Sequence, residues 1–291
     1  MYRYLSSYHA TSPSPPTSDS PPPPTPDGST PGSPSLRTFH PGRGADALWG
    51  LVELLYAGGL PPAVRPWFLG GRLIALRKEG DSPSSRKVRP IAIGSVLARV
   101  VSMIAARQFH PQFAAQLQPP LPDEPDRPRT QPDGSPWPIQ IGLTSSGLDL
   151  LVHTTSALLD THPDWLDAAC DVRNAFNALH RREFFAAIAS SFPDLLPWIS
   201  TMYSSPTELY FRTDDAFATI LSRCGVRQGC PLGAQLFALG LHPLLCRLQR
   251  LVGTRGVVIA YADDIHILAP PAVVREALLA LGLMVASTAK S

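Results

Sequence analysis

Two adjacent aspartates, Asp263 and Asp264, have the clearest capacity for chemistry in this chain, within the run VVIAYADDIHILA at residues 257–269. Apolar, β-branched residues flank the pair, which predicts two strands and a tight turn that presents both carboxylates at one tip. Ionised neighbouring carboxylates repel each other, so a protein that keeps them close is expected to hold a divalent cation there. Asp171, at the end of another strand-like run at residues 165–172, is the candidate third acid.

A second acid pair, Asp214 and Asp215, also lies between two strand-like runs. Asp is favoured in hairpin turns for backbone reasons alone, so the pattern by itself leaves either pair open to a purely structural role. Arg212 beside the second pair indicates a solvated hairpin. The apolar strands around Asp263 and Asp264 indicate instead a hairpin whose base lies in a core.

Hydrophobic periodicity predicts an α+β fold, with an antiparallel sheet backed by helices on one face. Ser95 is expected to cap a helix through Phe109. Pro243 is expected to interrupt a helix that starts near residue 232, and Gly282 to stop the last helix. The remaining predicted elements are a helix over 148–159, a strand over 165–172 that carries Asp171, a helix around 184–188, and hairpins over 208–221 and 257–269.

Proline is concentrated at the start of the chain, where eleven of the 33 prolines fall within the first 41 residues. Few large apolar residues accompany them, so this segment is expected to be a disordered tail. It is interpreted as a linker or a fortuitously translated stretch, with a ligand for aromatic-lined grooves as the alternative. A second Pro-rich patch, at residues 118–138, is interpreted as an insertion loop.

A formal net charge of +2 is too small to indicate nucleic-acid binding by itself. The basic side chains are concentrated at residues 72–89, where two strands and a turn could direct them at a phosphate backbone or a triphosphate. A solvated hairpin that protects a sheet edge from aggregation is the alternative.

Four short motifs in order carry a resemblance to reverse transcriptases. DVRNAF (171–176), GVRQGCPLG (225–233) and YADD (261–264) resemble the three central palm motifs of these enzymes. RPIAIG (89–94), preceded by LIALRK (73–78), resembles their fingers strands. The resemblance implies a palm-and-fingers polymerase core.

The resemblance is strongest to retrotransposons without long terminal repeats, the LINE-like elements. Residues 141–159 are similar to the helical segment that precedes the first Asp in that group, and residues 282–290 to the motif beyond the aspartate hairpin. The similarity spans about residues 70–290. Together with the composition of the chain, the resemblance divides it into three expected regions. These are a disordered tail over 1–45, a fingers-like region over 46–165 that includes the insertion at 118–138, and a palm over 166–291.

An RNA-directed DNA polymerase is the function that the resemblance implies, with two Mg²⁺ or Mn²⁺ ions as cofactors. Asp171 and Asp263 would bridge the ions, and Asp264 would be the weaker or indirect ligand. The carbonyl of Val172 would add an oxygen ligand. Without the other motifs, Asp171 could merely cap the following helix.

Substrate contacts are also carried over from the family. Phe176, five residues beyond Asp171, would lie under the sugar of the incoming nucleotide and exclude a ribose 2′-hydroxyl; an ordinary core aromatic is the alternative. Gln228 and Gly229 would contact the nascent base pair and the nucleotide. Lys78 and Arg89 would contact the triphosphate, and Arg77 competes with Lys78 for that role. The expected partners are an RNA template, a DNA primer and dNTPs.

The family pattern is incomplete in this chain. After the segment that follows the aspartate hairpin no thumb is expected, and no endonuclease, ribonuclease H or zinc-knuckle segment is recognisable. A catalytically silent retroelement remnant that at most binds nucleic acid or a partner is therefore the alternative function. No signal peptide or membrane span is recognisable, and an intracellular location, nuclear or cytoplasmic, is expected.

Overall fold

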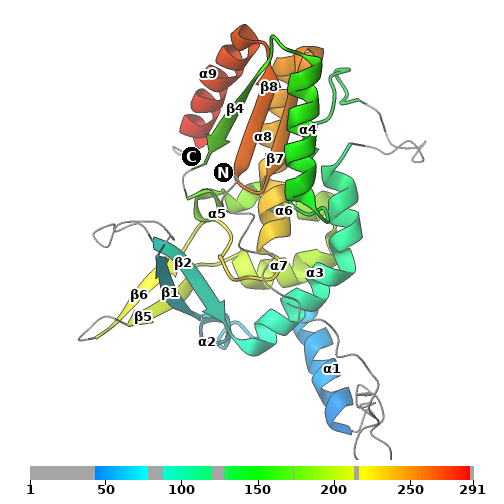
Figure 1. Cartoon of the computed structure of the whole chain (residues 1–291). Helices are drawn as coiled ribbons and strands as arrows, with labels where there is room; N and C mark the ends of the chain where they lie inside the picture. Colours follow the sequence, from blue (N-terminus) through cyan, green and yellow to red (C-terminus); the bar gives the residue numbers. More distant parts are fainter. Residues whose placement is uncertain are drawn as a thin grey trace, which may run out of the picture. The chain divides into compact units, whose positions relative to one another are not determined.

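The computed structural model describes residues 43–77, 88–119, 128, 130–172, 174–212 and 216–288 (Figure 1). The chain divides into two compact units, residues 1–46 and 47–291, and the second contains both sheets. The predicted tail at 1–45 and much of the Pro-rich patch lie outside the described residues. The helices are α1 (Arg43–Tyr56), α2 (Arg65–Leu69), α3 (Val96–Leu117), α4 (Gly147–Thr161), α5 (Ala175–Ala178), α6 (Arg181–Ser191), α7 (Leu196–Tyr203), α8 (Gly233–Val252) and α9 (Pro271–Thr288).

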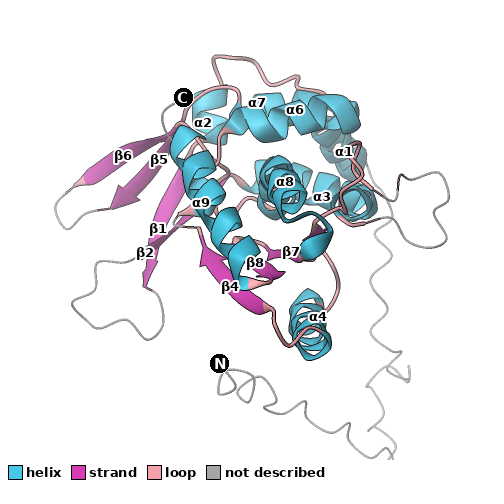
Figure 2. Ribbon diagram, turned by 90° about the horizontal axis from the view of Figure 1, so that it is seen from above, coloured by secondary structure: helices cyan, strands magenta, loops and turns pink. Residues whose placement is uncertain are grey.

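One four-stranded sheet has the order β3-β7-β8-β4. Its strands are β3 (Ile139–Gln140), β4 (Leu166–Asp171), β7 (Val257–Tyr261) and β8 (Asp264–Ala269). β7 and β8 form the hairpin predicted for the paired aspartates, and β4 runs antiparallel to β8. Helices α8 and α9 lie on one face of this sheet and α4 on the other (Figure 2). Strands β7 and β8 are largely buried between these helices, whereas the edge strand β4 is not.

The second four-stranded sheet has the order β2-β1-β5-β6. Its strands are β1 (Gly71–Arg77), β2 (Val88–Gly94), β5 (Thr207–Arg212) and β6 (Phe217–Ser222), and they form the two predicted hairpins β1–β2 and β5–β6. The hairpins join through a short parallel pairing of β1 with β5. Strands from both sides of residue 166 thus share each sheet, and the division into fingers-like and palm regions at that residue stays a prediction.

The α+β class is confirmed, but both sheets are of mixed orientation rather than purely antiparallel. β1 pairs with β5 and β3 with β7 in parallel. Helices also cover both faces of the β3-β7-β8-β4 sheet, not one face only. These pairings join segments far apart in the chain, and local periodicity carries no signal for them.

Three helix ends were predicted wrongly. α3 starts at the Ser95 cap, where the Oγ accepts a bond from the Ala98 N–H at 3.2 Å, but it continues past Phe109 to Leu117. α8 runs through Pro243 without interruption, and α9 runs through Gly282. Proline costs a helix one hydrogen bond and glycine costs it about 1 kcal/mol. Burial of the helix faces offsets both costs, because tertiary packing supplies most helical stability in proteins.

Candidate active site

The three predicted acids meet at one end of the β3-β7-β8-β4 sheet. β4 ends at Asp171 and β8 begins at Asp264, and the β4–β8 ladder places these two residues directly opposite each other. Opposed residues on antiparallel strands point to the same face of a sheet. Asp263 precedes Asp264 in the turn after β7. The fold therefore brings Asp171 beside a pair that is 92 positions away from it in the chain.

The turn that carries Asp263 is strained and tightly packed. Ala262 has a φ of 52°, in the left-handed region that costs a residue with a Cβ roughly 1 kcal/mol. Gly142, just after β3, approaches the turn so closely that a Cβ at that position would lie 2.8 Å from the Ala262 nitrogen. This contact holds the aspartate turn in one place.

The acids influence one another electrostatically. Burial raises the pKa of Asp264 above its ordinary value, and the negative charges of Asp263 and Asp171 raise it further. His266 lowers the same pKa, and it is itself held by Asp167, with 2.9 Å between Nδ1 and the nearer carboxylate oxygen. Burial and the two neighbouring carboxylates therefore disfavour the ionised form of Asp264, and a bound cation would relieve this cost.

The chemical types of the ligand atoms at this end of the sheet suit a hard divalent cation. Three carboxylates and the backbone carbonyl of Val172, the residue after β4, offer the oxygen ligands that Mg²⁺ prefers. Among the described residues, however, no group of three or more His, Cys, Asp or Glu side chains is arranged so that it could hold a metal ion. The described side chains therefore offer suitable oxygen atoms, but these are not already arranged as a metal-binding site.

Phe176 lies on the short helix α5, next to the aspartate-bearing strand β4. Its ring stacks on Phe237 of α8, with centroids 4.2 Å apart and an interplanar angle of 15°. The side chain is half-buried, and it lines a small cavity together with Gly142 and Ala262. The ring is thus packed in the core on one side and close to the aspartate turn on another.

Gln228 and Gly229 lie in a loop, residues 225–230, that links the other motifs. The N–H groups of Gly225 and Val226 donate to the carbonyls of Leu179 and Phe176, both at 2.8 Å. Gly225 has a φ of 66°, and a Cβ there would lie 2.3 Å from the Phe176 oxygen. Only glycine fits this approach.

The same loop is also bonded to β2. The Ala92 N–H donates to the Gln228 carbonyl at 2.7 Å. Gly229 has a φ of 105°, and a Cβ there would meet the Ala92 oxygen at 2.6 Å. The 225–230 loop therefore joins the helix after Asp171 to the strand that carries Arg89, and three motifs form one continuous structure.

The basic residues of the first hairpin are only partly described. Arg89 is exposed on β2, directly opposite Leu76 of β1. Lys78 and the turn that follows it lie outside the described residues, as do Asp214 and Asp215.

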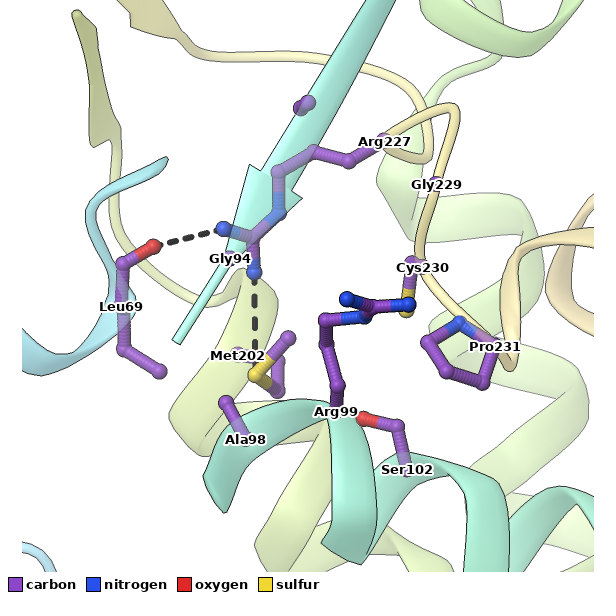
Figure 3. A pocket seen from close by; sticks show the side chains of 11 residues that line it. Leu69, Gly94, Ala98, Arg99, Ser102, Met202, Arg227, Gly229, Cys230 and Pro231 are labelled. Atoms are coloured by element: carbon purple, nitrogen blue, oxygen red, sulfur yellow. Dashed lines mark hydrogen bonds between the residues drawn. The ribbon is translucent and has the colours of Figure 1, made fainter. Parts of the chain in front are cut away.

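A residue that the sequence analysis did not single out, Arg227, lies at the centre of the junction between the 225–230 loop and β2. Its side chain is 5% exposed and lines a cavity together with Gly94, Arg99, Gly229 and Cys230 (Figure 3). The sequence feature that could have pointed to Arg227 is its position inside the motif GVRQGCPLG, where it directly precedes Gln228.

None of the helices in the described part of the chain combines the length and the apolar character that a membrane crossing requires.

Comparisons with known proteins agree with the motif order. Residues 76–284 match the reverse transcriptase (RNA-dependent DNA polymerase) family. A 149 kDa protein of the TX1 transposon of Xenopus laevis is 36% identical over 109 residues, which are 34% of this chain and 8% of that protein. The Pol polyprotein of the type-1 retrotransposable element R2 of Popillia japonica is 28% identical over 214 residues, which are 70% of this chain and 28% of that polyprotein.

The chain thus spans 28% or less of the length of these relatives. Among solved structures, apo telomerase from Candida tropicalis, truncated from its C-terminal domain, has a similar fold. The TM-score is 0.50 at 11% identity, over 81% of this chain and 51% of that one. The family match covers most of the chain, and the relatives belong to transposable elements. The chain is therefore a member of the reverse transcriptase (RNA-dependent DNA polymerase) family, of the LINE-like type that the motifs indicated.

Proposed function

We propose that this chain is an RNA-directed DNA polymerase core that extends a DNA primer along an RNA template with dNTPs. The observation that carries this proposal is the register of β4 and β8, which places Asp171 opposite Asp264, with Asp263 in the adjoining turn. Acids gathered at the end of a sheet that helices cover on both faces are held by backbone structure rather than by flexible loops.

Asp171, Asp263 and Asp264, with the carbonyl of Val172, would hold two Mg²⁺ or Mn²⁺ ions. When bound, such ions supply positive charge that stabilises the attacking and leaving oxygens of nucleotidyl transfer. The residues of the chain contribute the fixed oxygen atoms. Asp171 and Asp263 would be the principal ligands, and Asp264, whose pKa is raised, would be the weaker one.

Nucleotide positioning is assigned to the residues around the 225–230 loop. Gln228 and Gly229 would face the nascent base pair, and the exposed Arg89 would contact the triphosphate together with Lys78. The bond between the Ala92 N–H and the Gln228 carbonyl supports this grouping, because it fixes the loop against the strand that carries Arg89. Phe176 would lie under the nucleotide sugar.

Primer extension on an RNA template, with Mg²⁺ and with Mn²⁺, tests the proposal. The wild-type chain should extend the primer, and Asp263→Asn should abolish extension. Asp160→Asn, which changes an exposed acid on α4, is the matched control and should leave extension intact. No extension by the wild type under either metal would count against a polymerase.

Thermal or denaturant unfolding with Mn²⁺ gives an independent test of the metal site. A ligand at about 100 times its Kd stabilises by roughly 2.7 kcal/mol if only the folded state binds it. Asp263→Asn should remove most of this gain. Equal gains in the two proteins would favour a silent remnant that at most binds nucleic acid or a partner, an alternative supported by the lack of a preassembled metal group among the described residues.

Sugar selection tests the role of Phe176. Phe176→Ala should raise the use of ribonucleotides relative to deoxyribonucleotides, because the aromatic ring would no longer exclude the 2′-hydroxyl. The readout is the ratio of the two, since lost packing against Phe237 would lower both rates together. An unchanged ratio would assign Phe176 to the core alone.

A further inference from the structure

The 225–230 loop has neither helix nor strand of its own, so contacts from other elements must hold it. Its backbone bonds anchor Gly225, Val226 and Gln228 to neighbouring segments. Two arginine side chains supply further contacts, one from α6 and one from the loop itself. A nucleotide-facing loop held this way depends on the geometry of these side chains as well as on its backbone.

Arg181, the first residue of α6, bonds several chain segments at once. Its Nε donates to the Gly225 carbonyl at 3.1 Å, at the start of the loop. Its Nη1 donates to the carbonyls of Tyr203 at 2.9 Å and Ser205 at 3.3 Å. Its Nη2 donates to the carbonyl of Ser222 at 3.0 Å and to the Oγ of the same residue at 3.1 Å. One guanidinium thus ties the end of α7, the end of β6 and the loop together.

Arg227 makes the matching connection from inside the loop. Its Nη1 donates to the Leu69 carbonyl at 2.6 Å, at the end of α2, and its Nη2 donates to the Met202 sulfur at 3.6 Å (Figure 3). These groups lie at the junction between α2 and β1 and on α7. Because Gln228 directly follows Arg227, this anchor fixes the residue proposed to face the base pair.

Tyr203 lies against both guanidinium groups. The central carbon of Arg181 is 5.2 Å from the centre of the Tyr203 ring, and that of Arg227 is 5.5 Å from it. The ring is 1% exposed, and burial raises the pKa of its hydroxyl. At such distances an aromatic face attracts a cation, most strongly where water is excluded.

The two arginines carry like charges, Arg227 in a buried position and Arg181 in a half-buried one. Burial lowers the pKa of Arg181, and the charge of Arg227 lowers it further. No ion pair with a carboxylate of the described residues involves either arginine. Buried charges are tolerated when their donors are satisfied. Backbone carbonyls and the ring of Tyr203 therefore stabilise both cations, in one fixed arrangement.

We infer that Arg181 and Arg227 form a stack with the buried ring of Tyr203, and that this stack positions the 225–230 loop for nucleotide binding. All three are positioning residues, because they act through Gln228 and Gly229 rather than on the substrate. The inference rests on the proposed polymerase function and adds a determinant of nucleotide affinity outside the aspartate site. The rigid fork of arginine suits this role, and the single ammonium group of lysine does not.

Steady-state primer extension tests the positioning role of the stack, because such a role should affect the KM for dNTP and leave kcat little changed. Tyr203→Leu removes the aromatic face and should raise the KM for dNTP about tenfold, equivalent to about 1.4 kcal/mol, with kcat little changed. Tyr203→Phe, which keeps the ring, should restore the low KM. A fall in kcat alone, with KM unchanged, would overturn the inference.

Hydrogen exchange tests the positioning role of the stack independently of the proposed polymerase function, because the measurement needs no enzymatic activity. Peptides that cover residues 225–230 should exchange faster in Tyr203→Leu, while those from the β7–β8 hairpin should keep their protection. If the wild type extends no primer, the proposed function fails and the exchange data still decide whether the stack holds the loop. Unchanged loop protection in a folded Tyr203→Leu variant would contradict the stack.

Arg227→Lys provides a second variant in case the leucine variant does not fold. A lysine keeps the charge but has a single nitrogen, whereas Arg227 bonds the Leu69 carbonyl and the Met202 sulfur with two nitrogens held in a planar fork. It should raise both the KM and the exchange of the loop, whereas Arg250→Lys, at an exposed position on α8, should change neither. Equal behaviour of the two lysine variants would overturn the inference.

Discussion

The two sheets of the protein differ in how far they are covered. The β3-β7-β8-β4 sheet, which we call the palm sheet, has helices on both faces, and Ile259, Ile265 and Ile267 are completely buried in it. The β2-β1-β5-β6 sheet, the fingers sheet, leaves Phe217 80% exposed and Leu76 50% exposed. The acids are carried by the covered sheet, and Arg89 by the open one.

The covered sheet is suited to hold residues at fixed positions, whereas the open sheet leaves its residues accessible to solvent. A carboxylate site needs fixed distances, and a sheet with helices on both faces provides them. The hairpins of the fingers sheet are joined to each other through only two residue pairs, and to the 225–230 loop through the bond at Ala92 and through Arg181, which bonds both Ser222 and Gly225. Elements with few buried contacts open at lower free energy. We therefore expect the fingers sheet to open locally at a lower free energy than the palm sheet.

The difference in coverage between the two sheets should have its largest effect on how strongly core substitutions lower the free energy of unfolding. Ile267→Ala, in the palm sheet, should lower the free energy of unfolding by about 2 to 5 kcal/mol, because it leaves a cavity in a core that cannot collapse freely. Phe217→Ala, in the fingers sheet, should change it by no more than about 0.5 kcal/mol. Urea denaturation of both variants measures the difference. Similar losses would mean that the fingers sheet is buried against something in solution.

The negative charge of Asp264, at the tip of the palm sheet, should have a smaller effect on the free energy of unfolding. The pKa of Asp264 is raised in the folded state, so between the unfolded and folded pKa values the folded protein holds more protons. Stability therefore falls as pH rises through this window. Without metal, Asp264→Asn should be more stable than wild type at pH 7, by about 0.5 kcal/mol or less because solvent screens an exposed acid.

Denaturation as a function of pH checks this sign. The advantage of Asp264→Asn should vanish below the unfolded pKa of aspartate, near 3.9, where both proteins are uncharged at this position. An advantage that persists at low pH would have to come from packing and not from repulsion among the acids.

The smallest effect concerns the turn itself. Ala262→Gly should change stability by no more than about 0.5 kcal/mol, because relief of the left-handed conformation opposes the larger unfolded-state entropy of glycine. Ala218→Gly, in a regular strand of the fingers sheet, gains no such relief and should cost about 0.5 to 1 kcal/mol. A comparable loss at both positions would show that Ala262 is unstrained in solution.

Local sequence determined the hairpins, most helices and the acids at a strand end. The β-branched runs around Asp263 and Asp264 specify β7 and β8, and the Ser95 cap starts α3 where the pattern predicted. The order of the short motifs was enough to identify the family. These features depend on neighbours within a few residues, which is the range over which side-chain periodicity and capping act.

Only the tertiary structure decided which segments meet. The parallel pairings of β1 with β5 and of β3 with β7 join distant parts of the chain, and packing carries α8 through Pro243 and α9 through Gly282. Arg181 and Tyr203 belong to no motif, and their place around Arg227 follows from the burial of three segments against one another. Long-range contacts form where apolar surface is buried and buried donors find acceptors, and both conditions depend on the whole fold.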